Sequence, residues 1–122
     1  MRIISGKHKG RKLAPPGNLP VRPTTDYAKE SLFNILQNNF CFEDITILDC
    51  FSGTGNISYE FLSRGVKKVY SIDANHNCIA YQNKVKKELN FENFNPVRKD
   101  VFKALKSISE KFNIIFSDPP YD

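Results

Sequence analysis

The chain has 122 residues, is 40% hydrophobic and carries 18 Lys and Arg against 13 Asp and Glu, which gives a formal net charge of +5. This size allows one domain with a single core, and no apolar run approaches the ~20 residues that cross a bilayer. Cys41, Cys50 and Cys78 lack the spacing of a disulfide framework or a zinc site, and neither histidine has a metal-ligand pattern around it. We therefore expect a single cytoplasmic domain with no metal and no membrane partner.

The positive charge is concentrated at the amino end of the chain. Residues 1–30 hold seven Lys and Arg against Asp26 and Glu30, and the rest of the chain is neutral. A basic segment on a neutral body is typical of a surface that binds phosphate groups, although ordinary lysines on a solvated hairpin would give the same count. The basic residues expected to bind phosphates are Lys7, Lys9, Arg11, Lys12 and Arg22.

The amino-terminal segment is expected to form a short β-hairpin followed by a linker. Residues 2–5 and 11–13 flank a stretch that begins at Gly6 and ends at Gly10, and the prolines that follow favour an extended connection. This division gives a basic hairpin and linker over 1–23 and a cofactor-binding body over 24–122. Thr24 or Thr25 can cap the first helix of the body, whose apolar residues recur at helical spacing: Ala28, Leu32, Ile35 and Leu36.

The body then alternates strands and helices. Short apolar runs predict strands at 45–48, 69–72, 96–99 and 113–116. Gly65 is expected to end the helix after the first strand, and Asn75 to cap the helix after the second. The apolar residues at helical spacing are Ile57, Phe61 and Leu62, then Cys78, Tyr81, Val85 and Leu89, then Phe102, Leu105 and Ile108. This alternation predicts an α/β fold, a parallel sheet with flanking helices and a cleft at the carboxyl ends of its strands.

The stretch ITILDCFSGTGNIS, residues 45–58, joins the first of these strands to the helix after it. Gly53 and Gly55 allow a tight turn and the close approach of a ligand, and the helix aims its free N–H groups at the same place. A dinucleotide fits poorly, because Asp49 would repel a pyrophosphate and Ser58 stands where the third glycine of that fingerprint belongs. S-adenosylmethionine fits better because its ammonium and sulfonium groups are cations, and a plain tight turn without a ligand is the alternative.

Acidic residues also follow the other predicted strands. Asp73 ends the second strand about 20 residues after the glycine loop, where a carboxylate can bind ribose hydroxyls, and Asp100 follows the third. The last strand leads into the sequence SDPPY, residues 117–121. There Asp118 and a proline carbonyl can accept the hydrogens of a planar amine while Tyr121 stacks on its ring, and a merely rigid proline corner is the alternative.

Two groups of motifs resemble known families. LDCFSGTGNIS, the acidic Asp73, Asp100-Val101 and SDPPY look like motifs I to IV of the class I S-adenosylmethionine-dependent amino-methyltransferases. The opening MRIISGKHKGRKL, followed by RPTTDYAKESLFNIL, resembles the amino-terminal half of the bacterial family that methylates N2 of guanine 966 in 16S rRNA. The resemblance implies a Rossmann-like class I methyltransferase fold, S-adenosylmethionine as the methyl donor, and the 16S rRNA or the small ribosomal subunit as the partner.

The resemblance also implies roles for individual residues. Those expected at the methionine part of the cofactor are Asp49, Phe51, Gly53 and Gly55, with Arg22 and Thr24 closing over it. Asp73 is expected at the ribose, although many relatives have Glu there, and Asp100 is expected at the adenine with the Val101 backbone beside it. Those expected to hold the target base for catalysis are Asp118, Pro119, Pro120 and Tyr121.

The resemblance further predicts that the fold is truncated after its fourth strand. Methyltransferases of this class complete their sheet with strands beyond motif IV, whereas this sequence stops at Asp122. We therefore expect the fourth strand to form an edge of the sheet. We also expect weak stability and weak activity, because the catalytic turn lacks a following strand to hold it.

Three other functions share some of these features. DNA adenine-N6 and protein glutamine-N5 methyltransferases use a similar strand-end motif, because their acceptors are also planar nitrogens. A non-catalytic RNA-binding module with this fold would retain the basic segment. The basic segment disfavours a glutamine acceptor, and the presence of Asp118 beside a cofactor loop disfavours the non-catalytic module.

Overall fold

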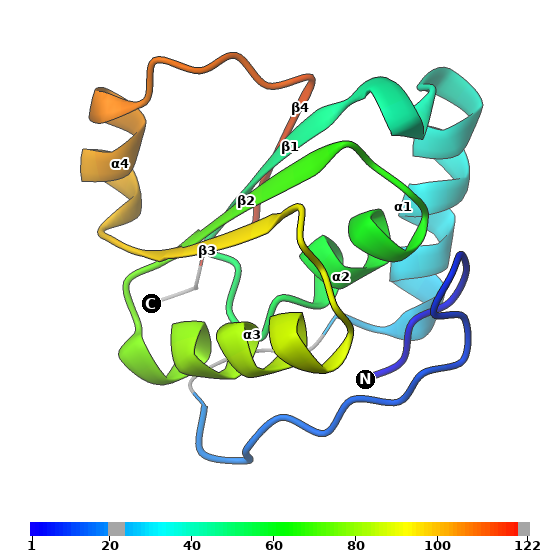
Figure 1. The fold of residues 1–122 in the computed structure, drawn as a ribbon, viewed down its shortest axis with the longest axis horizontal. Coiled ribbons are helices and arrows are strands. Elements are labelled where there is room, and N and C mark those ends of the chain that lie inside the picture. Colours follow the sequence, from blue (N-terminus) through cyan, green and yellow to red (C-terminus); the bar gives the residue numbers. More distant parts are fainter. Residues whose placement is uncertain (20–23, 120–122) are drawn as a thin grey trace.

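The fold is known from a computed structural model, which describes residues 1–19 and 24–119. Its helices are α1 (Asp26–Asn39), the short 3-10 helix η1 (Phe42–Asp44), α2 (Asn56–Ser63), α3 (His76–Glu88) and α4 (Val101–Ser107). Its strands are β1 (Thr46–Cys50), β2 (Lys68–Asp73), β3 (Phe94–Arg98) and β4 (Ile114–Ser117). Strands and helices alternate after α1 as the sequence predicted (Figure 1).

The four strands form one parallel sheet in the order β3-β2-β1-β4. The register places Cys50 of β1 beside both Ile72 of β2 and Ser117 of β4. β3 begins two residues earlier than predicted, because the fully buried ring of Phe94 belongs to the strand. The predicted α/β fold with a parallel sheet is confirmed, and β1 lies inside the described sheet with β4 at one edge.

Helices cover both faces of the sheet. On one face α1, α2 and α3 pack together with the amino-terminal segment, and Phe33, Tyr59 and Phe61 are fully buried there. On the other face α4 packs against the strands through a smaller cluster. That cluster consists of Leu48, Cys50, Ile72, Val101 and Ala104. The sheet therefore has a buried core on each side.

Helix α1 buries only part of the apolar face predicted for it. Its cap is Thr25, whose hydroxyl accepts a hydrogen bond from the Ala28 N–H, as expected. Its buried residues are Lys29 and Phe33, whereas Ala28 is exposed and the Ile35 side chain is 62% exposed. Leu32 and Leu36 are partly buried and pack against the main core, as the apolar pattern indicated. The pattern missed Lys29, because a lysine is rarely fully buried.

Helix α4 also presents an unexpected face to the sheet. Val101 and Ala104 are buried, whereas Phe102 is 66% exposed and Leu105 is 45% exposed. The Asp100 carboxylate caps the helix, so that Val101 is its first residue. Residues three apart share one face of a helix, and here that face is the one that begins at Val101.

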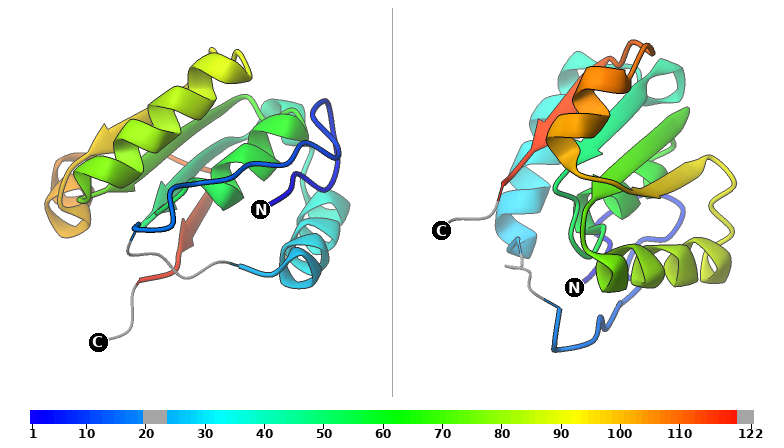
Figure 2. Two further views of the ribbon diagram at one scale, coloured as in Figure 1. Left: turned by 90° about the horizontal axis from the view of Figure 1, so that it is seen from below. Right: turned by 90° about the vertical axis from the view of Figure 1, so that its left-hand side faces the viewer.

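The amino-terminal segment forms a hairpin-like turn rather than two full strands. The Ile3 N–H donates to the Arg11 carbonyl at 3.0 Å, and one antiparallel bridge joins Arg2 to Lys12. The side chains of Ile3 and Leu13 are buried in the main core. Figure 2 shows the segment passing alongside α2, and this helix provides the backbone of the segment with partners that a second strand would otherwise supply.

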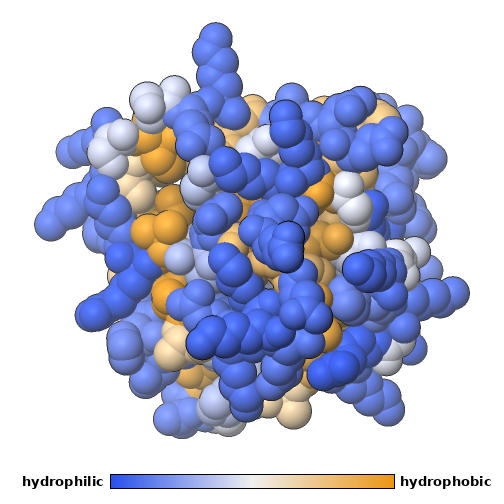
Figure 3. Space-filling view, in the orientation of Figure 1, coloured by the Kyte–Doolittle hydropathy of each residue, from blue (hydrophilic) through white to orange (hydrophobic). Residues whose placement is uncertain are grey.

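The surface of the described residues is mainly polar. Figure 3 shows one face covered mostly by hydrophilic side chains, with apolar atoms visible between them. Within residues 1–19 and 24–119, no helix is long and apolar enough to cross a membrane. The same ranges contain no group of three or more His, Cys, Asp or Glu side chains placed to hold a metal ion.

Candidate functional site

Four acidic residues lie at the carboxyl ends of the four strands. Asp49 lies in β1, Asp73 ends β2, Asp100 comes two residues after β3, and Asp118 comes directly after β4. Because the strands are ordered β3-β2-β1-β4, these residues follow one another along the sheet edge in the order Asp100, Asp73, Asp49, Asp118. The parallel sheet therefore brings the predicted site residues of four separate segments to one edge.

The loop between β1 and α2 carries three residues with left-handed backbone. Phe51, Gly53 and Gly55 have φ angles of 54°, 56° and 87°. Glycine adopts such angles freely, whereas Phe51 is strained there, and residues held in this way cluster at functional sites. A Cβ at Gly55 would lie 2.6 Å from the ring of Tyr59, so packing within the protein already requires this glycine.

The Asp49 carboxylate is buried and accepts a hydrogen bond from a side-chain hydroxyl group. It is 1% exposed, and its Oδ2 accepts a hydrogen bond of 2.7 Å from the Ser58 hydroxyl. Burial raises the pKa of Asp49 to about 7; the Ser58 bond opposes the rise, and the charges of Asp73 and Asp118 add to it. Ser58, which breaks the dinucleotide fingerprint, thus serves as the partner of this carboxylate. A cationic ligand placed against Asp49 would favour its ionised form.

Asp73 holds the glycine loop in place. Its Oδ2 accepts a hydrogen bond from the Gly53 N–H, and its Oδ1 accepts one from the Asn75 N–H, both at 2.9 Å. Each carboxylate oxygen can accept a second hydrogen bond, so this arrangement leaves acceptor capacity for ribose hydroxyls. The role of Asp73 inside the protein was not foreseen from the sequence.

A buried glutamine supports the same loop and was not predicted. Gln82 of α3 is fully buried, and its Nε2 donates to the Ser52 hydroxyl at 2.9 Å and to the Gly53 carbonyl at 2.7 Å. Its Oε1 accepts a hydrogen bond of 2.7 Å from the Ser71 hydroxyl of β2. The available signal was a polar residue four positions after Cys78, on the apolar face of its helix. Gln82 thus ties α3 and β2 to the loop.

The predicted adenine residues lie at the start of α4. Asp100 Oδ1 accepts a hydrogen bond of 3.0 Å from the Lys103 N–H, and Val101 is 3% exposed. The exposed ring of Phe102 lies edge to face with the ring of Phe51, with ring centroids 5.9 Å apart. Phe102 therefore extends the aromatic surface beside the loop, a role that the sequence did not indicate.

The predicted catalytic residues are described only in part. Asp118 and Pro119 are exposed and follow β4, whose Ser117 pairs with Cys50 at the end of β1. This register starts the turn that carries the predicted catalytic residues beside the glycine loop. Pro120, Tyr121 and Arg22 were also predicted site residues, and they lie outside the described residues.

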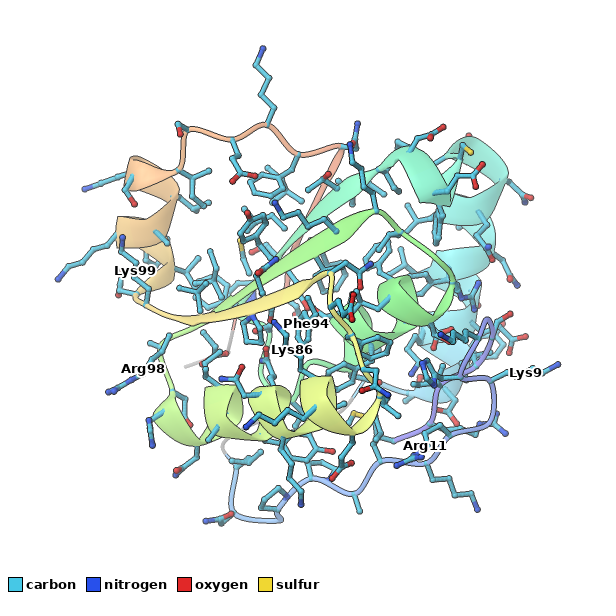
Figure 4. The ribbon with its side chains drawn as sticks, viewed as in Figure 1. Lys9, Arg11, Lys86, Phe94, Arg98 and Lys99 are labelled. Carbon is cyan, nitrogen blue, oxygen red and sulfur yellow. The ribbon has the colours of Figure 1, made fainter. Side chains whose placement is uncertain are left out.

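Four of the residues predicted to bind phosphates are described by the structure, and all four are exposed: Lys7, Lys9, Arg11 and Lys12. Arg11 Nη2 lies 3.8 Å from Glu88 Oε2, and both side chains are at least 41% exposed, so this pair is weak and leaves the guanidinium accessible. Figure 4 shows Lys9 and Arg11 on this segment, on the opposite side of the view from Arg98 and Lys99 at the end of β3. Positive side chains are thus available in two places.

The parallel sheet, its glycine loop after β1 and the acidic strand ends define a Rossmann-like fold of the methyltransferase type. Magnesium protoporphyrin IX methyltransferase from Synechocystis, solved with bound SAH, shares this fold at a TM-score of 0.59 and 19% identity, over 73% of this chain and 39% of that one. The yhhF protein from Escherichia coli matches at a TM-score of 0.89 and 32% identity, over 99% of this chain and 64% of that one. The family model described as "Conserved hypothetical protein 95" matches residues 1–122, and this chain belongs to that family.

Several curated relatives of the chain carry the same name. Proteins called ribosomal RNA small subunit methyltransferase D, from Buchnera aphidicola subsp. Baizongia pistaciae and from Escherichia coli K12, are 33% and 35% identical to it. Both alignments include 99% of this chain and cover 61% and 60% of those proteins. The chain therefore spans about three-fifths of the length of these relatives, and the resemblance to their family is confirmed.

Proposed function

We propose that this chain forms the cofactor-binding and catalytic part of an S-adenosylmethionine-dependent methyltransferase. Its proposed acceptor is N2 of a guanine in 16S rRNA, the guanine at position 966. The name of the relatives supports an rRNA substrate. The observation that carries the proposal is the row of four carboxylates on adjacent strand ends, with the buried Asp49 at its centre.

The residues at the sheet edge fit S-adenosylmethionine. The Asp49 carboxylate favours a cationic neighbour, Asp73 retains acceptor capacity for the ribose, and Asp100 can accept from the adenine amine. When bound, the cofactor supplies an electrophilic methyl group, whose bonding electrons stay on the departing sulfur. The four carboxylates of the same edge disfavour a pyrophosphate, because like charges repel.

Asp118 is proposed to orient the target amine. The lone pair of an exocyclic guanine nitrogen is delocalised into the ring, and the Asp118 carboxylate together with the Pro119 carbonyl can accept its two hydrogens. These bonds favour a pyramidal nitrogen and so expose its lone pair. Because chemistry on a base requires that base to leave its stack, the target guanine must be unstacked to reach Asp118. Pro120 and Tyr121 complete the proposal, with Tyr121 stacking on the base.

Transfer of a labelled methyl group tests the acceptor. The chain should label 16S rRNA in preference to DNA or release-factor protein. Label on DNA would indicate an adenine-N6 enzyme, and label on release factor a glutamine-N5 enzyme. Binding of S-adenosylhomocysteine and RNA without any transfer would favour a non-catalytic RNA-binding module.

Asp118→Ala tests the catalytic role. Single-turnover methylation should fall by a few powers of ten while cofactor affinity stays near normal, because orientation of the acceptor is lost and the cofactor site is not. Asp44→Ala serves as the control, since Asp44 is an exposed aspartate in η1, away from the carboxyl ends of the strands. Full activity in the Asp118 variant would remove this residue from the mechanism.

The exposed basic residues of the amino-terminal segment are proposed to bind the phosphates of the RNA. The variant replaces four of them with alanine: Lys7, Lys9, Arg11 and Lys12. The slope of log K against log salt should fall by roughly 3 in magnitude, because each phosphate contact contributes about 0.7 to 0.9. Replacement of Lys106 and Lys111, which are exposed elsewhere, is the control. An unchanged slope would indicate that these side chains form an ordinary solvated surface and do not bind phosphates.

A further inference from the structure

Lys29 of α1 has no exposed surface. Its Nζ donates to the backbone carbonyl of Arg2 and, at 2.8 Å, to Asn56 Oδ1, and it lies 3.4 Å from Glu60 Oε1. Two of its three N–H donors are used in these hydrogen bonds, and the Glu60 carboxylate pairs with its charge. Arg2 belongs to the amino-terminal segment, and Asn56 is the first residue of α2, directly after the glycine loop. Lys29 therefore joins the segment to the start of α2.

Glu60 of α2 holds the same segment through its backbone. Its Oε1 accepts a hydrogen bond of 2.9 Å from the Ile4 N–H, in addition to facing Lys29. Its Oε2 accepts hydrogen bonds of 3.1 Å from the Ser5 N–H and 2.7 Å from Arg64 Nε. With four donors around a fully buried carboxylate, the segment and both basic side chains share one polar centre.

The segment stays in contact with α2 as far as the end of that helix. The Lys7 N–H donates to the Ser63 carbonyl at 2.7 Å, and the Ser63 hydroxyl donates to the Ser5 carbonyl at 2.7 Å. A Cβ at Gly6 would lie 1.9 Å from the Ser63 oxygen, so only glycine allows this approach. The backbone that carries the exposed basic side chains is therefore fixed to α2.

We propose that Lys29 is a positioning residue that couples RNA on the amino-terminal segment to S-adenosylmethionine at the glycine loop, so that the two bind cooperatively. This inference rests on the proposed function. RNA held by Lys7 and Lys9 restrains further the backbone that Lys29 and Glu60 bind. The hydrogen bonds of Lys29 to the Arg2 carbonyl and to Asn56 carry that restraint to the start of α2, directly after the glycine loop. By linkage, the cofactor must strengthen RNA binding by the same factor.

Stability alone is a poor reason for a lysine at this position. Burial lowers the pKa of Lys29, and Glu60 only opposes this shift, so the fold bears a cost for keeping a cation there. Well-packed apolar residues often replace a buried ion pair without loss of stability. An apolar residue at position 29 could not hold Asn56, and this link to the loop is what the ammonium group adds.

Calorimetric titrations test the coupling. S-adenosylhomocysteine is the probe, because it carries no methyl group to transfer, and it is titrated with and without saturating 16S rRNA transcribed in vitro. In the wild-type chain, RNA should tighten its binding at least about fivefold. We call the association constant with RNA divided by that without RNA the coupling ratio. Lys29→Met and Asn56→Ala should each bring this ratio close to one. Lys84→Met, a helical lysine that is 70% exposed, should leave the ratio unchanged.

Asn56→Ala is the decisive variant. It removes one side-chain bond and leaves the contact between Lys29 and Glu60 in place, so it separates coupling from folding even if Lys29→Met unfolds. A wild-type ratio of one, or an undiminished ratio in Asn56→Ala, overturns the inference while the proposed function stands. A wild-type chain that binds neither probe contradicts the proposed function, and the inference with it.

Discussion

The pKa of Asp49 leads to a prediction about cofactor binding. A bound cation requires the carboxylate to be ionised, whereas burial raises its pKa to about 7 in the free protein. With that pKa, the ionised fraction falls about 25-fold between pH 7.5 and pH 5.5. The association constant for S-adenosylmethionine should therefore fall about 25-fold over the same range. Calorimetry in buffers of different ionisation enthalpy should also show protons released on binding at pH 6.

Two variants separate Asp49 from other groups that titrate. Asp49→Asn should bind weakly at every pH and lose the pH dependence, because the side chain has no proton to release. Ser58→Ala removes the 2.7 Å bond that favours the ionised form, so the midpoint should move upward by about one pH unit. An association constant that does not change from pH 5.5 to 7.5 would refute the proposal that Asp49 binds the cationic part of the ligand. The same conclusion would follow if Asp49→Asn kept the pH dependence of the wild-type association constant.

Three further predictions concern stability and the loop. Because the pKa of Asp49 is raised from 3.8 to about 7, the free energy of unfolding should fall by up to about 4 kcal/mol as the pH rises from 4 to 8, and urea titrations of Asp49→Asn should not show this loss. Gly6→Ala should destabilise the fold by several kcal/mol, because its Cβ would collide with a backbone oxygen 1.9 Å away. Gly10→Ala, at nearly the same φ with open space around it, should cost only about 1 to 2 kcal/mol in the same assay, and equal losses would contradict the docking of the segment. Asp73→Ala should weaken S-adenosylhomocysteine binding roughly 10- to 150-fold, because a charge-assisted bond is worth ~1.5–3 kcal/mol, and unchanged affinity would exclude Asp73 from the site.

Local rules recovered much of the fold from the sequence. Thr25 and Asn75 cap their helices as expected, and Gly65 ends α2 with a φ of 92°, because caps and turns depend on neighbouring residues alone. The strand-end carboxylates were also predictable, since in a parallel sheet all carboxyl ends lie at one edge. Only the order of the strands along that edge, which sets Asp100, Asp73, Asp49 and Asp118 in a row, came from the structure.

Contacts between distant segments were the part that the sequence could not supply. Lys29 was assigned to no buried face because a lysine is normally solvated. Its hydrogen-bond partners Arg2 and Asn56 each lie 27 positions away in the sequence. Gln82 was overlooked for the same reason, since it binds a loop 29 and 30 positions earlier in the chain. In both cases a polar side chain takes a buried position whose hydrogen-bond partners become visible only in three dimensions.

The docking of the amino-terminal segment on α2 also sets an order of events during synthesis. The bonds from Ile4, Ser5 and His8 reach residues 55 to 58 positions later, so they form only after α2 exists. At ~5–20 residues per second, Ile4, Ser5 and His8 wait roughly 3 to 11 seconds for Glu60 and Ser63 to be added. Throughout that interval the positively charged segment lacks its partners on α2. The segment can therefore bind α2 only after the residues of this helix have been synthesised.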